Sequence, residues 1–459
     1  MNKAALRLLL VFSLMAALIG AASGTAMAQT GAFPAYTSGV QVANLEGTVA
    51  NITLAAYNQD GTKNGSDLTD TIPANGSKTY FPISNVQAGF NGSLVFSSDK
   101  KIAAISNILA IAGGVTGKAA ASYVGRDTGA TTIRLPLLNK GNSGFNTWFS
   151  VQNAGTADAT ISIDYSDNGI GADKTETIKP GAAKVFYQSA ETHTAATFAG
   201  TVTSTNNQPL VAAVIQESSA VMFAYTGFTG AGSTAPVFPL INANNSGYIT
   251  GLQIQNAGAQ ETEVTVSYTP GTGTGTACTE KQTIAPGASK TFALLAFANS
   301  SLGAAENCLD GVRFVGSAKV TANSTNQPLV GIGNQLFPNR NGEAYGSFSA
   351  DEATAKVVMP LIMARNGGYF TGFSVQNVGD AATTVSCSFT NTSETIAATT
   401  LQPGQALADL QANRFGTGAY VGAGTCTAAA GGKIVAVVNQ LGASTANDQL
   451  LVYEGIAAQ

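Results

Sequence analysis

Apolar and polar residues alternate with a period of two along much of the chain. Between positions 149 and 165 the apolar residues fall on one face of extended segments and the polar residues on the other: Phe149, Val151, Ile161, Ile163 and Tyr165 against Ser150, Gln152, Ser162 and Asp164. This alternation is typical of half-buried β-strands. The sequence Asp167-Asn168-Gly169 then indicates a tight hairpin turn, because such turns need residues that tolerate positive φ. No segment shows a convincing helical spacing of apolar residues.

One motif occurs three times without a gap. It spans Gly144–Asn153, Gly247–Asn256 and Gly368–Asn377, and every copy ends in Gln-Asn. A weaker copy, Gly39–Asn44, lies nearer the N-terminus. The copies are about 100 to 120 residues apart, which is the size of a domain and far above that of a solenoid unit.

The same features follow the motif in the same order in each repeat. A turn comes first, and three repeats carry Pro-Gly there: Pro180, Pro286 and Pro403. An aromatic-x-Gly signature comes next: Phe90, Phe198, Phe314 and Tyr420. A tyrosine close to a glycine ends the repeat: Tyr123, Tyr225, Tyr345 and Tyr453. A Pro-Leu pair then opens the next repeat: Pro136, Pro239 and Pro360.

Seven or eight short strands in about 110 residues, separated by Gly, Pro and Asn turns, are typical of a two-sheet sandwich. We therefore predict an all-β protein of four tandem immunoglobulin-like β-sandwich domains. The predicted boundaries are 1–28 for a signal peptide, 29–127 for a divergent first repeat, and 131–230, 235–350 and 355–459 for the other repeats. The junctions are short, so we expect the sandwiches to lie end to end in an elongated array.

The N-terminal residues have the three parts of an export signal. Lys3 and Arg7 are basic, residues 8–19 form an apolar core, and Ala26-Met27-Ala28 is a small-x-small cleavage site. Cleavage after Ala28 would place the mature protein outside the cell or at its surface. The apolar core is shorter than the roughly 20 residues that span a bilayer, so we predict no integral membrane segment after cleavage.

Charged residues make up 10% of the chain and the formal net charge is −4. An average soluble domain has about 25% charged residues. No basic cluster is present that would hold phosphates, so nucleic acid is not an expected partner.

The four cysteines fall in the last two repeats, as Cys278 and Cys308 in the third and Cys387 and Cys426 in the fourth. Four cysteines allow three pairings, and the even division favours one bridge within each repeat. Cys387 stands where Ile163 and Val266 stand in the sister repeats, so we expect its bridge to cross the core between the sheets. The other bridge is expected to be a peripheral staple. The alternative is that all four are free thiols, two buried and two exposed.

The sequence offers little for catalysis, and we predict that the protein is not an enzyme. His193 is the only histidine, and its polar surroundings predict a solvated loop residue. Scattered carboxylates and the absence of a nucleophile elbow nominate no catalytic residue. Residues 58–67 carry alternating oxygen side chains, as a calcium loop does, but lack its bidentate glutamate, so a hairpin turn is the preferred interpretation. No cofactor or metal site is predicted.

Trp148 is the candidate surface contact. It is the only tryptophan, it replaces Gly251 and Gly372 of the sister motifs, and its position matches the outward residues of its strand. An outward aromatic residue can stack on a sugar or anchor a protein interface. The alternative is that Trp148 packs against a neighbouring sandwich or loop.

The repeated unit of apolar-x-apolar-Gln-Asn-x-Gly, an alternating strand, Pro-Gly and a further strand resembles the immunoglobulin-like repeats of bacterial surface proteins, notably the cell-adhesion-related CARDB type. The resemblance covers nearly the whole chain after residue 28 and implies an extracellular stalk or adhesion module, without catalytic residues. The first hypothesis is thus a structural or adhesive protein that binds itself or a cell-surface protein or glycan. The second is an extracellular array of carbohydrate-binding modules.

Overall fold

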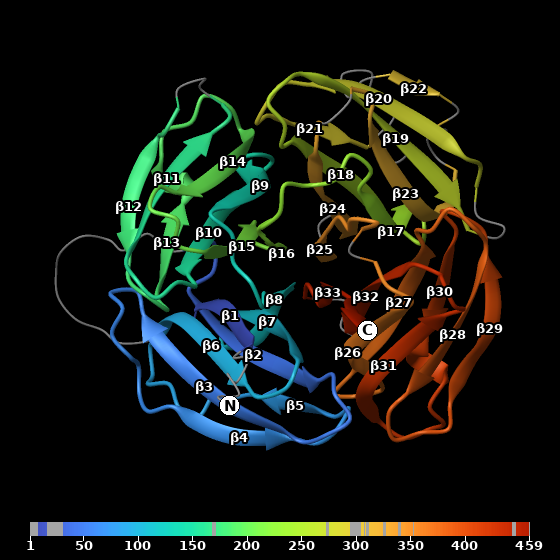
Figure 1. Cartoon of the computed structure of the whole chain (residues 1–459), viewed down its shortest axis with the longest axis horizontal. Coiled ribbons are helices and arrows are strands. Elements are labelled where there is room, and N and C mark those ends of the chain that lie inside the picture. The colour runs from blue at the N-terminus through green and yellow to red at the C-terminus, as the bar shows by residue number, and fades with distance from the viewer. Residues whose placement is uncertain are drawn as a thin grey trace, which may run out of the picture. The chain divides into compact units, whose positions relative to one another are not determined.

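The computed structural model describes residues 8–15, 31–167, 171–271, 275–293, 304–306, 308, 312–324, 327–337, 341–351, 353–442 and 447–458 (Figure 1). Within these residues the protein is all-β, and the only helical segments are the short 3-10 turns Gln188–Ala190 and Gln411–Asn413. Every strand pairing between neighbours is antiparallel, and each sequence repeat contributes two sheets. The all-β prediction is confirmed.

Residues 1–230 form one compact unit. The first repeat, in blue in Figure 1, has the strands β1 (Leu8–Met15), β2 (Ala35–Asn44), β3 (Ala50–Asn58), β4 (Leu68–Ile72), β5 (Ser77–Tyr80), β6 (Asn91–Ser98), β7 (Ile102–Ala112) and β8 (Val115–Val124). The second has β9 (Thr132–Asn139), β10 (Asn146–Asn153), β11 (Ala159–Tyr165), β12 (Lys174–Ile178), β13 (Ala183–Tyr187), β14 (Thr197–Ser204), β15 (Leu210–Glu217) and β16 (Met222–Thr226). The sheet orders are β1-β6-β3-β4 and β5-β2-β7-β8, then β12-β11-β14-β9 and β13-β10-β15-β16.

Residues 231–459 form the other compact unit. The third repeat has β17 (Val237–Ala243), β18 (Ile249–Asn256), β19 (Thr262–Pro270), β20 (Cys278–Ile284), β21 (Ser289–Phe292), β22 (Ala304–Glu306), β23 (Phe314–Ala322), β24 (Leu329–Phe337) and β25 (Asn341–Gly346). The fourth has β26 (Lys356–Ala364), β27 (Tyr369–Asn377), β28 (Thr383–Phe389), β29 (Thr395–Leu401), β30 (Ala406–Leu410), β31 (Tyr420–Ala428), β32 (Ile434–Gly442), β33 (Leu450–Glu454) and β34 (Ile456–Ala458). The sheet orders are β17-β23-β19-β20-β22 and β21-β18-β24-β25, then β29-β28-β31-β26-β34 and β30-β27-β32-β33.

The two sheets of a repeat share one core, which makes the fold β-sandwich-like. In the first repeat, Val42 of β2 and Leu54 of β3 are fully buried in the same apolar cluster although they belong to different sheets. The alternation seen in the sequence produces this packing: β11 buries Ile161, Ile163 and Tyr165 on one face. The strand β10 differs from the expectation because the polar residues on its outer face are also buried.

The outer face of β10 is buried because the two repeats of the first unit pack side by side. Ile215 and Met222 of the second repeat belong to the same apolar cluster as the first-repeat residues Tyr36 and Ile108. In the second unit, Val437 and Val452 of the fourth repeat likewise join the core cluster of the third. The expectation that neighbouring sandwiches lie end to end is therefore wrong within each unit. Short junctions did not reveal that the outer sheet faces carry enough apolar residues to pack on each other.

The asparagine of the repeated motif holds the turn between two strands together. The Asn153 side-chain amide donates to the carbonyls of Ala157 (2.7 Å) and Ile178 (2.8 Å), and its oxygen accepts the backbone N–H of Gly155 (2.8 Å). We call this arrangement the Asn bracket. Asn44, Asn256 and Asn377 make the same set of hydrogen bonds in their repeats. The first repeat thus keeps the bracket although its sequence motif is weak.

We expect Asn153→Ala to lower the free energy of unfolding of residues 1–230 by about 3 kcal/mol. The side chain is fully buried, and its removal leaves the Ile178 and Ala157 carbonyls without their donor. Urea unfolding followed by the fluorescence of Trp148, the only tryptophan, measures the effect. Asn51→Ala is the control, because Asn51 is exposed and its loss should stay within about 0.5 kcal/mol. Equal effects of the two substitutions would contradict the bracket.

In the second, third and fourth repeats, the tyrosine that ends the repeat contacts the Pro-Leu pair that opens it. The strands β9, β17 and β26, which carry the pair, each shift register with their partner strand at this point. The shift falls between Phe238 and Ile241 in β17 and between Met359 and Ile362 in β26. For β9 it falls opposite Phe198 and Gly200 of the partner β14. The hydroxyl of Tyr225 donates to the Leu137 carbonyl (2.7 Å), and those of Tyr345 and Tyr453 donate to the carbonyls of Leu240 and Leu361. Proline has no N–H for the ladder, and the buried hydroxyl binds a carbonyl at this irregular point. The sequence showed both features but not that they meet.

Candidate functional site

Trp148 lies in the contact between the first two repeats. Its side chain is 4% exposed. It packs edge-on against Tyr36 of the first repeat, with ring centroids 6.2 Å apart, and against Tyr187 of the neighbouring strand β13 at 6.3 Å. Trp148 lies on the outward face of β10, as predicted. The prediction that it forms a surface contact is wrong, because the first repeat covers this face of β10. The alternative, packing against a neighbouring sandwich, is what the structure has.

A buried carboxylate lies beside this aromatic cluster. Glu217, at the end of β15, is 2% exposed. Its two oxygens accept hydrogen bonds from the first repeat, one from the backbone N–H of Ala32 (2.6 Å) and one from the Tyr36 hydroxyl (2.7 Å). Burial raises the pKa of Glu217 to about 6, although the hydrogen bonds from Tyr36 and Ala32 act in the opposite direction. Sequence reasoning missed Glu217, because its partners are distant in the chain.

We expect the first unit to lose about 2 kcal/mol of stability between pH 4.5 and pH 7 through Glu217. Its folded pKa of about 6 lies above the ordinary value of 4.5, so the folded state holds its proton more tightly than the unfolded state. The stabilisation is therefore complete below pH 4.5 and is lost as the pH rises through 6. Urea midpoints measured by Trp148 fluorescence across this range test the prediction. Glu217→Gln should remove this part of the pH dependence, whereas Glu176→Gln, in a partly exposed ion pair, should leave it in place.

The second unit uses the same mode of packing with different chemistry. The Ser317 hydroxyl donates to the Gly404 carbonyl (2.6 Å), as the Ser93 hydroxyl donates to the Gly181 carbonyl (2.6 Å) in the first unit. Gln335 and Asn439 exchange two side-chain hydrogen bonds of 3.1 and 3.0 Å. The first contact contains the Trp148 and Tyr36 rings and the carboxylate of Glu217, whereas the second combines paired amides with carboxylates: Asp448 accepts the backbone N–H of Gly342 (3.1 Å) and Glu454 that of Gly346 (2.5 Å). In each unit these side chains join two neighbouring repeats and so stabilise the contact between them.

Both predicted disulfides are present. Cys387 and Cys426 face each other as a directly opposed pair on the neighbouring strands β28 and β31 of one sheet. The expectation that this bridge crosses between the two sheets is wrong, because the position of Cys426 pairs within the sheet, as Val202 pairs with Ile163 and Val320 with Val266 in the sister repeats. Cys387 is 3% exposed and Cys426 is fully buried.

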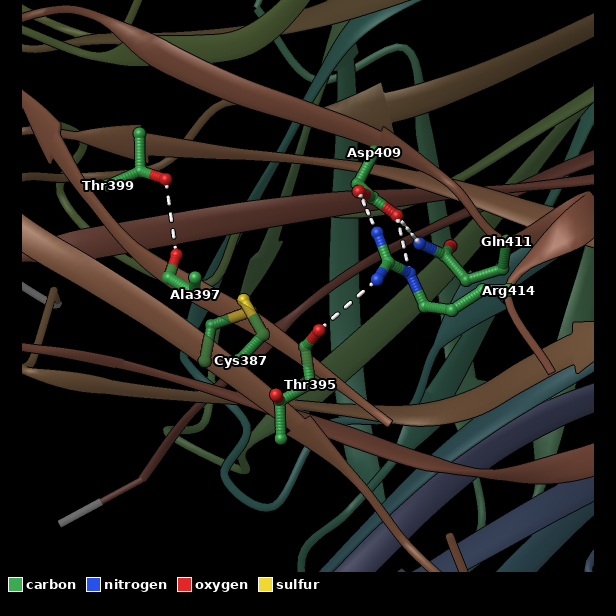
Figure 2. Close-up of a disulfide and its surroundings, with 8 residues drawn as sticks. Cys387, Thr395, Ala397, Thr399, Asp409, Gln411 and Arg414 are labelled. Atoms are coloured by element: carbon green, nitrogen blue, oxygen red, sulfur yellow. Dashed lines mark hydrogen bonds and ion pairs between the residues drawn. A yellow bond between two sulfur atoms is a disulfide. The ribbon is translucent and has the colours of Figure 1, made fainter. Parts of the chain in front are cut away.

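Figure 2 shows what surrounds the Cys387–Cys426 bridge. The guanidinium of Arg414 forms an ion pair with Asp409 of β30 and donates to the Thr395 carbonyl of β29 at 3.2 Å. Gln411 also donates to Asp409. Because β29 and β30 belong to different sheets, these bonds tie the two sheets of the repeat together. The polar side chains near the disulfide are thus bonded to one another.

The Cys278–Cys308 bridge begins on β20, the strand next to the edge strand β22 of its sheet. Cys278 is 4% exposed and belongs to the core of the third repeat, whereas Cys308 packs at the margin of that core. The expected peripheral staple is therefore anchored in the core at one end.

His193 is not a solvated loop residue. Its side chain is 1% exposed, stacks on Phe198 with centroids 4.0 Å apart and meets the Tyr165 ring edge-on at 4.9 Å. Burial lowers the pKa of the imidazole, although Asp167, 3.4 Å away, acts in the opposite direction. The polar residues next to His193 in sequence led to the prediction of a solvated side chain. The aromatic rings that cover it, Tyr165 and Phe198, come from the strands β11 and β14 of the repeat. The imidazole ring therefore packs against the rings of Tyr165 and Phe198.

The oxygen-rich segment from Asn58 to Asp67 is internally bonded. The Asp60 carboxylate accepts hydrogen bonds from Thr62, the Asn64 amide donates to the Asn58 side chain, and Lys63 pairs with Asp67 at 2.7 Å. A lysine on the last carboxylate fits the hairpin interpretation of this segment. Across the described residues, no cluster of His, Cys, Asp and Glu side chains could hold a metal ion. Nor does any described helix have the length and apolarity to cross a membrane.

Comparison of the chain with protein-family models and with curated proteins found no match. The resemblance to the immunoglobulin-like repeats of bacterial surface proteins therefore stays a prediction from the sequence.

Proposed function

We propose that the chain is an exported structural or adhesive protein of the cell surface, built from four tandem immunoglobulin-like sandwiches and without catalytic activity. One observation carries the proposal. The polar residues that recur from repeat to repeat are used inside the fold: the asparagines in the four Asn brackets, and the final tyrosines of the last three repeats on backbone carbonyls. A recurring catalytic or ligand-binding residue would instead point into an open site.

The disulfides support a location outside the cell. No free cysteine occurs, since all four are paired, and such bridges persist in oxidising compartments. The sparse charge and the abundance of small polar residues suit a surface that meets other macromolecules without strong electrostatic selection. Its partners would be a second copy, a cell-surface protein or a glycan.

The burial of Trp148 weakens the carbohydrate-binding alternative. Such an array needs exposed aromatic rings at equivalent positions of several repeats, and Trp148 is covered by the first repeat. At the corresponding positions the sister repeats have Gly251 and Gly372. The structural or adhesive role is therefore the better supported one.

Fractionation of producing cells tests the proposal. We expect the protein in the surface fraction, accessible to added protease on intact cells and released by a high-salt wash or by detergent. A cytoplasmic pool with free thiols would overturn it. Saturable binding of one sugar on a glycan array, combined with release into the medium, would favour the carbohydrate-binding alternative.

A further inference from the structure

The first repeat takes one of its strands from the N-terminal segment. Strand β1 pairs with β6 over its whole length, from Leu8 opposite Ser98 to Met15 opposite Asn91, and so completes the sheet β1-β6-β3-β4. The position beside β6 is an edge of this sheet. We call it the β6 slot.

The other repeats fill the corresponding slot with a strand from their own first residues. In the second repeat β9 pairs with β14, in the third β17 pairs with β23, and in the fourth β26 pairs with β31. Each of these strands carries the Pro-Leu pair held by the final tyrosine. A strand at this position is thus a regular part of the fold.

The strand β1 lies inside the predicted signal peptide. Cleavage after Ala28 would remove it and leave residues 29–34 ahead of β2. These six residues are too few to turn back and supply an eight-residue strand. Two of them are also engaged elsewhere, since the Ala32 N–H donates to Glu217 and Phe33 is buried in the core. The exported chain would therefore have an open β6 slot.

The chemistry of the slot defines what can fill it. Leu94 and Phe96 of β6 are fully buried in the core, and the backbone groups of β6 that pair with β1 need new partners once β1 is gone. An extended segment of about eight residues with apolar side chains at alternate positions would restore both the ladder and the cover of the core. On its other side β1 lies close to β10 and β15 of the second repeat, so an incoming segment would lie between β6 and these strands, and an unpaired strand edge tends to pair with another chain.

We propose that the first repeat of the exported protein is a strand acceptor, which binds an extended apolar segment of a different polypeptide in the β6 slot. The proposal rests on the proposed export with cleavage after Ala28. A different polypeptide is favoured over a second copy because β9, β17 and β26 are already paired in their own repeats. We infer the length and apolar character of the bound segment from β1, which lies in the slot in this structure.

A disulfide-trapping experiment on the chain 29–459 tests the proposal. The probe is a lysine-flanked peptide with the sequence of Leu8–Met15 and the change Leu9→Cys, because Leu9 lies opposite Ser97. Ser97→Cys on the partly exposed end of β6 is the target, and Thr71→Cys on the exposed opposite edge strand β4 is the matched control. All native cysteines are already paired. We expect a crosslink at Ser97→Cys, none at Thr71→Cys, and none when the chain 1–459 keeps its own β1.

Three results would overturn the strand acceptor: equal crosslinking at the two edges, no crosslinking at either, or a signal segment that stays attached to the exported protein. N-terminal sequencing of exported material decides the last. Retention would remove the open slot while leaving the surface location intact, so it is distinguishable from failure of the proposed function. A cysteine-free peptide should also slow amide exchange in β6, and crosslinking without this slowing would count against strand pairing.

Discussion

Trp148→Ala is expected to lower the free energy of unfolding of residues 1–230 by about 4 kcal/mol. The indole is nearly fully buried between the two repeats of the first unit, against Tyr36 and Tyr187. Its removal takes away a large apolar area and leaves a cavity that the two sheets can close only in part. Hydrogen exchange in β10 and β15 under mild denaturant measures the loss, and strands of residues 231–459 give the internal reference.

Phe81→Ala is the matched control for Trp148→Ala. Phe81 follows strand β5, which corresponds to β13, but its side chain is 53% exposed. Its truncation should cost within about 1 kcal/mol, because little buried area is lost. If Trp148→Ala left the stability unchanged and instead abolished binding to a partner, Trp148 would be a surface residue after all and the packing of the two repeats would be wrong.

Removing the Cys387–Cys426 bridge should cost the fourth repeat about 4 kcal/mol. The two cysteines are 39 residues apart in sequence, and a crosslink over such a loop restricts the unfolded chain by about this amount in the entropic model. The best variant is Cys387→Val with Cys426→Val, because Val266 and Val320 form the equivalent cross-strand pair in the third repeat. This choice keeps the pair apolar and removes mainly the covalent link.

Reductant provides a second measurement with an internal control. Residues 1–230 contain no cysteine, so unfolding followed by Trp148 fluorescence should not change when the bridges are reduced. Amide protection in β28 and β31 should fall. Protection in the fourth repeat that survives both the double substitution and reduction would show that packing alone holds these strands.

The sequence predicted the strands well because their pattern is local. Alternation alone places Ile161, Ile163 and Tyr165 on the buried face of β11, and turn residues mark where strands end. The pairing of the cysteines also followed from their division between repeats. These features depend on residues close in the chain or on simple repetition.

Contacts between repeats could not be predicted in the same way. The burial of Trp148 depends on Tyr36, and the hydrogen bonds of Glu217 depend on Ala32 and Tyr36, all more than a hundred residues away. Neither pattern nor propensity carries that information. The expectation that the Cys387–Cys426 bridge crosses between the sheets failed for a related reason, because parity shows which face a residue occupies but not which strand lies beside it. The His193 prediction failed because local polarity does not report rings brought in from other strands.

A structural role at the cell surface is tested most directly by measuring the attachment of producing cells to each other and to solid surfaces, with and without this chain. Deletion should reduce attachment and remove the surface label of an antibody to the protein. Re-expression of the unaltered chain should restore both, and expression of the Trp148→Ala chain should restore them less fully. Unchanged attachment after deletion, with the protein found only in the medium or inside the cell, would contradict the proposed role.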